Sequence, residues 1–233
     1  MKLCKIADLT VLIDYQYETM SRQIVPYEIL NEKVNPDIIV KADTVAYDFV
    51  KTTYPELSTD ESEYIITGFR FYEGLIDYEG LMLHASCVVY KDNAYLFSAD
   101  SGVGKSTHTR LWQELFGDEA IILNDDKPAI RIVGDTAYAY GTPWSGKNGL
   151  NANIKAPIKG ICFIHQSHEN HIQKVEPKKV LVSLLKQTLR PVNPEKSNKM
   201  LDNVEKLIET VSMYEMGCNT DIDAARVAYE GMR

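Results

Sequence analysis

Residues 94–112, AYLFSADSGVGKSTHTRLW, join an apolar stretch to an amphipathic one through a short loop rich in glycine. The loop matches the phosphate-binding pattern G-x-x-x-x-G-K-[ST] except at its first position, where Ala99 stands in place of glycine. In such a loop, successive backbone N–H groups and the N-terminus of the following helix point at one anion. Gly102 and Gly104 let the loop curl without Cβ clashes. A strand, this loop and a helix in succession predict an α/β fold.

We expect this loop to bind the phosphates of a nucleotide. Lys105 would reach the β- and γ-phosphates, and the hydroxyl of Ser106 would bind Mg²⁺. A Gly-Lys-Ser turn that occurs by chance is the alternative, but the strand before the loop and the helix after it favour the phosphate site. The expected phosphate-binding residues are Ser101, Gly102, Val103, Gly104, Lys105, Ser106 and Thr107.

A pair of carboxylates follows the next apolar run, in the segment IILNDDKPAI. Asp125 and Asp126 lie 19 and 20 residues after Ser106, which leaves room for one helix, one turn and one strand. One carboxylate could fix Mg²⁺ while the other takes a proton from an attacking hydroxyl. A solvated turn before Pro128 is the alternative, and the phosphate loop nearby favours the site.

His84 precedes the phosphate loop on the other arm of an expected hairpin. A turn at Asp92-Asn93 places His84 opposite Ser101, and a three-residue turn places it opposite Asp100. Either register leaves His84 beside the loop, where we expect it to contact phosphate or to neighbour the metal. A purely structural histidine is the alternative.

A loop rich in Gly, Pro and Asn spans residues 140–151, YGTPWSGKNGLN. We expect Trp144 and Lys147 to be exposed there and to contact the substrate or the nucleotide. A packed turn is an equal alternative. Arg190, which precedes Pro191, could supply positive charge to the transition state, although the sequence does not fix where it points.

The composition limits the partners and the compartment. A formal net charge of -8 disfavours nonspecific binding to nucleic acid, which needs a surplus of Lys and Arg. The N-terminal segment is broken by Asp8 and Asp14, so we read no signal peptide, and no apolar run reaches the length of a membrane span. We expect a soluble, cytoplasmic protein with free thiols and no structural zinc, because its cysteines form no C-x-x-C pair: Cys4, Cys87, Cys162 and Cys218.

Strands, helices and hairpins alternate along the chain, which predicts an α/β fold with a mixed sheet. Residues 1–58 read as a small β-rich N-terminal region, and residues 59–233 as the phosphate-loop domain. In the first region we expect strands at 5–15, 23–30 and 37–43. In the second we expect strands at 81–90, 94–100, 120–125, 129–135, 136–141, 159–166 and 212–218, and helices at 61–78, 106–116, 177–189, 198–211 and 221–232.

The helix expected at 61–78 begins the second region. Its apolar residues recur at spacings of four and three, which makes one stripe that we expect to be buried. Ser58 or Thr59 would cap it. The stripe consists of Ile65, Phe69, Tyr72 and Ile76.

The segment from His84 to Pro128 resembles the catalytic domain of HPr kinase/phosphorylase, which shares its P-loop core with ATP-dependent phosphoenolpyruvate carboxykinases. The resemblance rests on the strand histidine, the DSGVGKS loop and the NDD pair. It implies that core with a mixed sheet, ATP and Mg²⁺ as cofactors, and phosphoryl transfer to a serine-type hydroxyl. It would make Lys105 a phosphate-binding catalytic residue, place Ser106 and Asp125 at the metal, make Asp126 the catalytic base and His84 the active-site histidine.

The whole chain is also similar to short bacterial HPr-kinase-like proteins whose substrate we cannot name. The acidic signature stretch that HPr kinases carry further on has no match here, so the acceptor stays open between a small molecule, a peptide and a protein. The leading hypothesis is a kinase. A nucleotide-binding regulator and an NTPase switch without an acceptor are the alternatives. Relatives of this kind commonly assemble, so we also expect a homo-oligomer.

Overall fold

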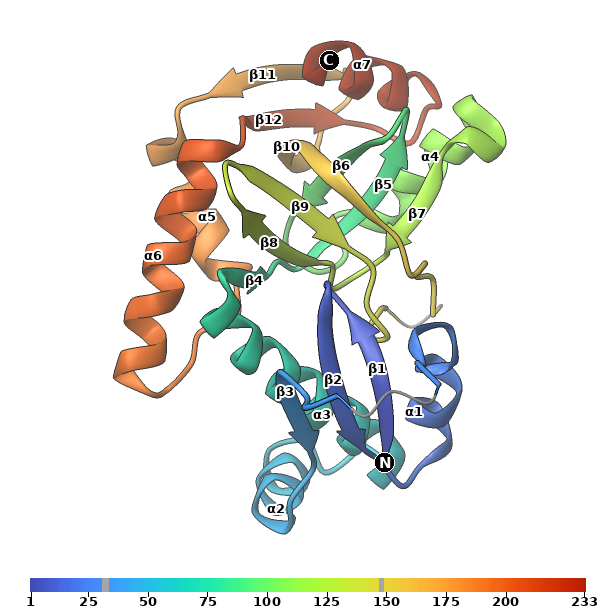
Figure 1. Cartoon of the computed structure of the whole chain (residues 1–233). Coiled ribbons are helices and arrows are strands. Elements are labelled where there is room, and N and C mark those ends of the chain that lie inside the picture. Colours follow the sequence, from blue (N-terminus) through green and yellow to red (C-terminus); the bar gives the residue numbers. More distant parts are fainter. Residues whose placement is uncertain (31–33, 147–148) are drawn as a thin grey trace.

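The computed structural model describes residues 1–30, 34–146 and 149–233. It holds a small N-terminal sheet, ordered β1-β2-β3, and a larger mixed sheet, ordered β4-β8-β9-β10-β6-β5-β7, with β12 beside β10 and β11 beside β12 (Figure 1). The predicted α/β architecture with a mixed sheet and a small N-terminal sheet is confirmed. The strands are β1 (Lys2–Ile6), β2 (Leu9–Asp14), β3 (Ile38–Lys41), β4 (Gly80–Met82), β5 (Ala85–Tyr90), β6 (Asn93–Ser98), β7 (Ile121–Asn124), β8 (Ala129–Val133), β9 (Thr136–Tyr140), β10 (Lys155–Gln166), β11 (His171–Val175) and β12 (Met213–Cys218).

The N-terminal region contains helices that the sequence analysis did not predict. The strand expected at 23–30 is wrong, because α1 (Glu18–Gln23) and the 3₁₀ helix η1 (Val25–Tyr27) cover half of this stretch and no strand forms in the rest. The buried residues Met20, Ile24 and Tyr27 follow helical rather than strand spacing, and Pro26 removes a ladder donor. Helix α2 (Thr44–Thr53) was also missed, although Asp43 caps it by accepting a hydrogen bond from the backbone N–H of Ala46 at 2.9 Å.

Helix α3 (Thr59–Leu75) is confirmed, and its cap is Ser58, which forms a capping box with Glu61. The predicted stripe is only half right. Tyr72 is buried, and so is Ile76, which lies in the 3₁₀ helix η2 (Ile76–Tyr78). Ile65 and Phe69, in contrast, are 43% and 39% exposed. The N-terminal sheet packs on α3 through Phe71, Tyr72 and Leu75, so the buried face of the helix only partly coincides with the predicted stripe.

The hairpin that leads to the phosphate loop has a different register from either one predicted. Lys91 and Asp92 form the turn with φ of +47° and +60°, as a two-residue hairpin of the type I′ class requires. Ala85 therefore pairs with Ser98 and Cys87 with Leu96. His84 comes one residue before that ladder, so continuing it places His84 opposite Ala99 rather than opposite Asp100 or Ser101.

Strand β5 lies between β6 and β7 and is antiparallel to both. Because two neighbours that are each antiparallel to the same strand run in the same direction, β6 and β7 end at one edge of the sheet. The phosphate loop follows β6, the Asp125-Asp126 pair follows β7, and His84 lies just before β5 starts at that same edge. The strand order thus gathers three separate segments at one place.

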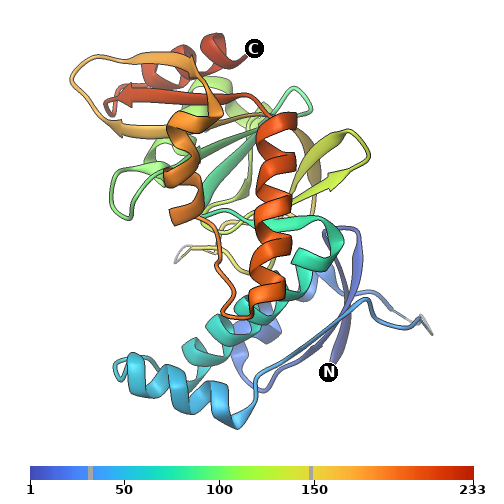
Figure 2. The same cartoon turned by 90° about the vertical axis from the view of Figure 1, so that its left-hand side faces the viewer.

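Strand β10 is longer than predicted and connects two parts of the larger sheet. Its first residues pair antiparallel with β9, and its later residues pair in parallel with β6 and β12. Strand β11 was not predicted; the helices α4 (Lys105–Phe116), α5 (Pro177–Lys186), α6 (Pro194–Thr210) and α7 (Asp223–Met232) confirm the predicted ones. Helix α6 runs alongside the larger sheet towards the N-terminal region (Figure 2).

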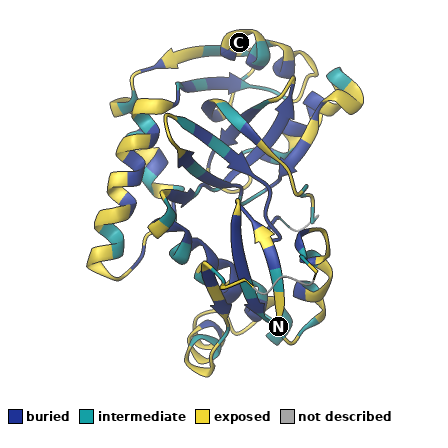
Figure 3. Ribbon diagram, in the orientation of Figure 1, coloured by how far each residue is buried: buried dark blue, intermediate teal, exposed yellow. Residues whose placement is uncertain are grey.

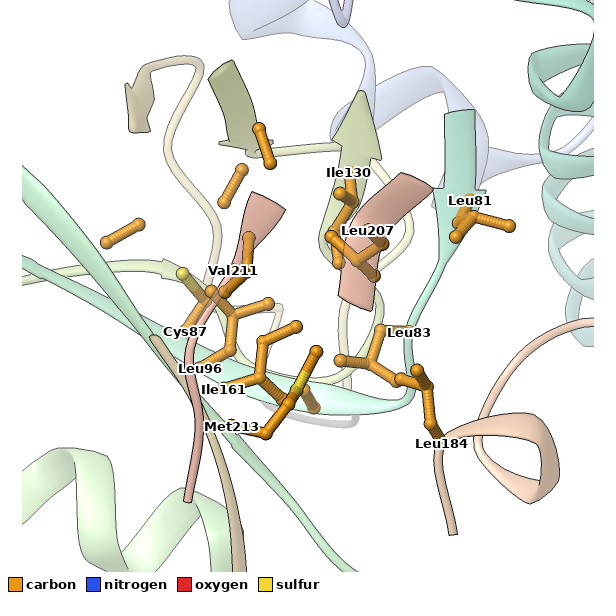
Figure 4. Packing of buried hydrophobic residues seen from close by; sticks show 14 of the residues in the cluster. Leu81, Leu83, Cys87, Leu96, Ile130, Ile161, Leu184, Leu207, Val211 and Met213 are labelled. Atoms are coloured by element: carbon orange, nitrogen blue, oxygen red, sulfur yellow. The ribbon is translucent and has the colours of Figure 1, made fainter. Parts of the chain in front are cut away.

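Three apolar clusters hold these elements together, and buried positions concentrate in the strands (Figure 3). In the first, side chains of the sheet such as Leu83, Cys87 and Leu96 pack near Leu184 of α5 and Leu207 of α6 (Figure 4). The second joins the N-terminal sheet to α3 and reaches into the β8–β9 hairpin. The predicted division of the chain after residue 58 stays a prediction. Helix α3, which begins the predicted second region, packs on the sheet of the first region.

The third cluster surrounds Trp112 on α4, the helix that follows the phosphate loop. Tyr229 of α7 packs edge-on against the Trp112 indole, with ring centroids 6.1 Å apart. Ala225 and Ala228 of α7 are fully buried in the same cluster. None of the described helices combines the length and the apolarity needed to cross a bilayer.

Candidate active site

The phosphate loop has the backbone that its sequence predicts. Gly102 and Gly104 adopt φ of +82° and +120°, which residues with a side chain rarely tolerate. A Cβ atom added at either glycine would meet no heavy atom within 4 Å, so the space beside the loop is open. Helix α4 starts at Lys105, directly after the loop, so its N-terminal N–H groups face the same space.

Lys105 lies beneath the loop. Its ammonium donates to the carbonyl oxygens of Ala99 at 2.9 Å and Asp100 at 3.4 Å, and the residue is 7% exposed. Burial lowers the pKa of Lys105, while the nearby carboxylates of Asp126, Asp100 and Asp125 counteract that shift. The strand order brings the loop after β6 and the carboxylates after β7 to the same edge of the sheet as this lysine.

Ala99 explains why the loop tolerates the missing first glycine. It is not among the residues with positive φ, so its backbone conformation suits any L-residue. Its methyl group lies in the apolar cluster around Trp112, where a glycine would leave less contact area. Ala99 accepts the hydrogen bond of Lys105 through its backbone carbonyl, which every residue has.

Asp125 is buried next to the first turns of α4. Its Oδ1 accepts a hydrogen bond from Ser86 Oγ at 2.8 Å, and Ser86 Oγ also bonds with Thr109 Oγ1 at 2.7 Å. Its Oδ2 makes no hydrogen bond to any described residue, which leaves one carboxylate oxygen for a ligand. Within the described ranges no group of three or more His, Cys, Asp and Glu side chains could hold a metal. Mg²⁺ bound by one or two protein oxygens, phosphate oxygens and water fits this donor set.

Asn124 holds the acidic pair in its turn. Its side-chain Oδ1 accepts from the backbone N–H groups of Asp126 at 3.0 Å and Lys127 at 2.7 Å. Its Nδ2 donates to the carbonyl oxygens of Thr142 and Trp144 and to Thr142 Oγ1, at 3.0 to 3.2 Å. An asparagine side chain that bonds to the backbone two and three residues ahead fixes a local turn. Asn124 therefore ties the two aspartates that follow it to the loop at 141–146.

We expect Asn124→Ala to lower the free energy of unfolding by about 2–4 kcal/mol, because it leaves buried backbone groups without partners. Urea unfolding measures the change. Asn153→Ala is a matched control, since Asn153 makes a single exposed hydrogen bond to Pro26. Equal stability of the two variants would contradict a structural role for the Asn124 amide.

The carboxylate of Asp126 has two partners, His84 and Lys127. Its Oδ1 lies 3.1 Å from His84 Nε2, and its Oδ2 forms an ion pair with Lys127. Burial acts to raise the pKa of Asp126, but the hydrogen bond from His84 and the charge of Lys127 outweigh it and lower this pKa to about 2. The carboxylate is therefore ionised at neutral pH, and its side chain is 20% exposed.

This low pKa has a consequence for stability. A carboxyl with a lower pKa in the folded than in the unfolded chain stabilises the fold above pH 4, and the contribution is lost as the pH falls from about 4 to 2. Between pH 7 and pH 2 the stability of the wild type relative to Asp126→Asn should fall by about 2 kcal/mol. Urea titrations of both proteins across this range measure it. A constant difference would show that Asp126 has an ordinary pKa.

Gln187 joins His84 to the phosphate loop, and the sequence analysis missed it. His84 Nδ1 lies 2.8 Å from Gln187 Oε1, and Gln187 Nε2 donates to Asp100 Oδ1 at 2.8 Å. The backbone N–H of His84 also donates to the carbonyl of Gln187 at 2.8 Å. The expected proximity of His84 to the loop holds, through this glutamine and in a register different from the predicted ones.

The three residues proposed for substrate contact have different outcomes. Trp144 is 1% exposed, its ring stacks on Phe71 at 4.8 Å and its Nε1 donates to Thr67, so the predicted exposure is wrong and the packed turn is correct. Lys147 lies outside the described residues. Arg190 is exposed and makes no hydrogen bond or ion pair within the described part of the chain, so its proposed role stays a prediction.

A cavity of about 550 Å³ adjoins the phosphate loop on the side of β10 and β12. Gly102, Gly104 and Thr107 line one side of it, and Gln166 and Asn219 line the other. His108 also lines it, and the Nδ1 of this buried histidine has no hydrogen-bond partner among the described residues. Burial lowers the pKa of His108 to about 4, so its ring is neutral at pH 7.

Comparisons with known proteins leave the function to be argued from the site. No family model and no curated protein matches the chain. Among solved structures it is similar to the Hpr(Ser) kinase/phosphatase from Coxiella burnetii, with a TM-score of 0.35 and 11% sequence identity, covering 64% of this chain and 91% of that one. A likeness of this size carries no argument about activity or substrate.

Proposed function

We propose that this protein transfers the γ-phosphoryl group of ATP to a hydroxyl acceptor in a Mg²⁺-dependent reaction. The observation that carries the proposal is the convergence of the phosphate loop, Lys105 and the ionised Asp126 at one edge of the sheet. A protein that only binds nucleotide has no use for a second, partly exposed carboxylate held beside the phosphate lysine. ATP as the donor also follows the resemblance of the loop and the acidic pair to the HPr kinase family.

Phosphoryl transfer asks the protein mainly for positioning and charge stabilisation. The loop N–H groups and Lys105 would bind the β- and γ-phosphates. Ser106 and Asp125 would hold Mg²⁺, which neutralises phosphate charge when bound. The ammonium of Lys105 would stabilise negative charge on the transferred group.

Asp126 would receive the acceptor. A carboxylate with a pKa of about 2 is a weak base, and a loose transition state needs little proton removal before the phosphoryl group moves. We therefore assign Asp126 to orient the acceptor hydroxyl by accepting its hydrogen bond. His84 and Lys127 hold this carboxylate, and Gln187 ties His84 to the loop, so acceptor and donor sides are fixed relative to each other.

The cavity beside the loop would take the nucleoside part of ATP. Trp112 Nε1 donates to His108 Nε2 at 3.4 Å, which leaves the proton of the neutral ring on Nδ1. An unpaired buried donor is costly, and a nucleoside oxygen or nitrogen would satisfy it. This assignment of His108 is part of the same proposal.

Incubation with γ-labelled ATP and Mg²⁺ tests the proposal. The protein is assayed alone and with a cytosolic extract that has been separated into small-molecule and protein fractions. We expect label to move into one fraction, and the transfer to disappear with Asp126→Asn. Release of free phosphate without an acceptor would instead identify an NTPase, and unchanged ATP would identify a regulator that only binds nucleotide.

A further inference from the structure

A second, smaller cavity adjoins the acceptor side of the site. It has a volume of about 190 Å³ and lies between α3, Trp144 and the residue that follows Asp126. Its lining includes Ile65, Gly68 and Phe69 of α3, together with Lys127. Because the ammonium of Lys127 pairs with Asp126, this cavity and the carboxylate share one residue.

The polar atoms around this cavity already have partners inside the protein. The Tyr64 hydroxyl bonds with the backbone of Ser145, and the Tyr72 hydroxyl donates to the carbonyl of Lys127 and bonds with Thr142 Oγ1. Trp144 Nε1 donates to Thr67 Oγ1 at 3.2 Å. The walls therefore offer carbon surface, and the ammonium of the lining residue Lys127 pairs with Asp126 on a side chain that is partly exposed.

The size of the cavity limits its occupant. An apolar cavity of about 150 Å³ in a protein core binds benzene, so a group of about that size fits here. A sugar or a phosphate would lose its hydration without gaining partners on these walls. Gly68 lets Trp144 pack directly on α3 at the cavity wall, since a Cβ atom there would lie 2.9 Å from Trp144 Cδ1.

We propose that the phosphoryl acceptor is a small molecule that carries a compact apolar group, of benzene size or less, beside its hydroxyl. The apolar group enters the cavity lined by Ile65, Phe69 and Trp144, and the hydroxyl reaches Asp126 past Lys127. The exposure of Ile65 and Phe69 has a reason in this arrangement, because they contact a ligand rather than the core. The inference rests on the proposed kinase function, and it names the class of acceptor.

The experiment uses benzyl alcohol as the probe, glycerol as a polar comparison, and ligand-observed NMR on the full chain. We expect benzyl alcohol to bind and glycerol not to bind. Phe69→Gln and Ile65→Gln should each weaken the binding of benzyl alcohol by about tenfold, which corresponds to about 1.4 kcal/mol. Phe49→Gln on α2 is the matched control, since Phe49 is 68% exposed and does not line this cavity.

A transfer assay then separates the two proposals. Benzyl alcohol should itself accept label and should compete with the acceptor of the small-molecule fraction, and Phe69→Gln should lower both labelling reactions while ATP binding stays at the wild-type level. Labelling that is equal in Phe69→Gln and Phe49→Gln, with no binding of benzyl alcohol, would overturn the apolar acceptor and leave the kinase in place. Binding of benzyl alcohol without any labelling would show that the cavity binds an apolar group, but it would overturn the kinase and with it the acceptor.

Two further results would also overturn the acceptor class. Label that enters only the protein fraction, at a rate that Phe69→Gln reduces, would assign the cavity to a protein side chain. A change from dimer to monomer on Phe69→Gln in sedimentation, without binding of benzyl alcohol, would assign it to contact with a second copy. Circular dichroism of each variant shows that the fold is retained.

Discussion

Lys105→Ala is expected to lower the rate of phosphoryl transfer by about 10²–10³-fold and to weaken the binding of ATP. The lysine ammonium lies against the carbonyl oxygens of the loop, at the start of the helix whose N-terminus faces the proposed phosphate site. No other described lysine has its ammonium bonded to the loop. Single-turnover labelling and calorimetry with ATP measure the two effects.

Lys5→Ala is the control for this substitution, because Lys5 is exposed on β1 and far from the loop in the fold. It removes the same charge and should leave both measurements unchanged. The thermal unfolding of Lys105→Ala must also be recorded, since the lysine is buried. Full activity in Lys105→Ala would show that this loop does not hold the transferred phosphate.

Asp126→Asn is expected to leave the affinity for ATP near the wild-type value and to lower turnover by about 10²-fold, the effect of a misplaced reactant. The asparagine keeps the size of the side chain, but it removes the charge that pairs with Lys127 and the second acceptor oxygen. The acceptor hydroxyl then loses the group that orients it. Parallel measurements of nucleotide binding and of transfer under saturating ATP and Mg²⁺ test this separation.

Asp125→Asn provides the comparison, because it should act on the metal side. We expect it to raise the Mg²⁺ concentration that half-saturates ATP binding, while Asp126→Asn leaves that concentration unchanged. Equal losses of nucleotide affinity in both variants would make Asp126 a metal ligand and would remove the acceptor role from it.

The main elements of the site could be predicted from the sequence because each one is local. The phosphate loop needs two glycines, a lysine and a serine in succession, and Ala99 fits because that position has ordinary backbone dihedrals. The cap at Ser58 and the helix after the loop also depend on neighbours in the sequence. The mixed sheet follows from the alternation of hairpins and helices.

The rest depends on contacts between distant segments. Gln187 bonds with His84, 103 residues earlier, and nothing in the pattern of α5 marks the residue that follows this helix as part of the site. The hairpin register failed because the turn uses Lys91 and Asp92 with positive φ, where sequence rules favour Asn and Gly. Trp144 is buried because its ring stacks on Phe71 and its Nε1 donates to Thr67, and both of these residues belong to the distant helix α3.

The apolar stripe on α3 shows a related limit. Periodicity identifies which residues share a helix face, but it does not say which part of that face the remainder of the chain covers. Ile76 and Tyr72 are buried, although Tyr72 also lines the cavity, whereas Ile65 and Phe69 border that cavity and stay partly exposed. Only the three-dimensional arrangement separates the two halves of the stripe.

The packing of α7 against α4 has a consequence for folding during synthesis. The ribosome makes α4 long before α7, and until then the Trp112 indole lacks Tyr229 and the buried alanines as a cover. The packing of α4, whose N-terminus faces the proposed phosphate site, is therefore completed only after α7 has been synthesised. If ATP binds more tightly when α7 is docked, then bound ATP stabilises the docking of α7. By thermodynamic linkage, docking strengthens the binding of ATP by the same free energy.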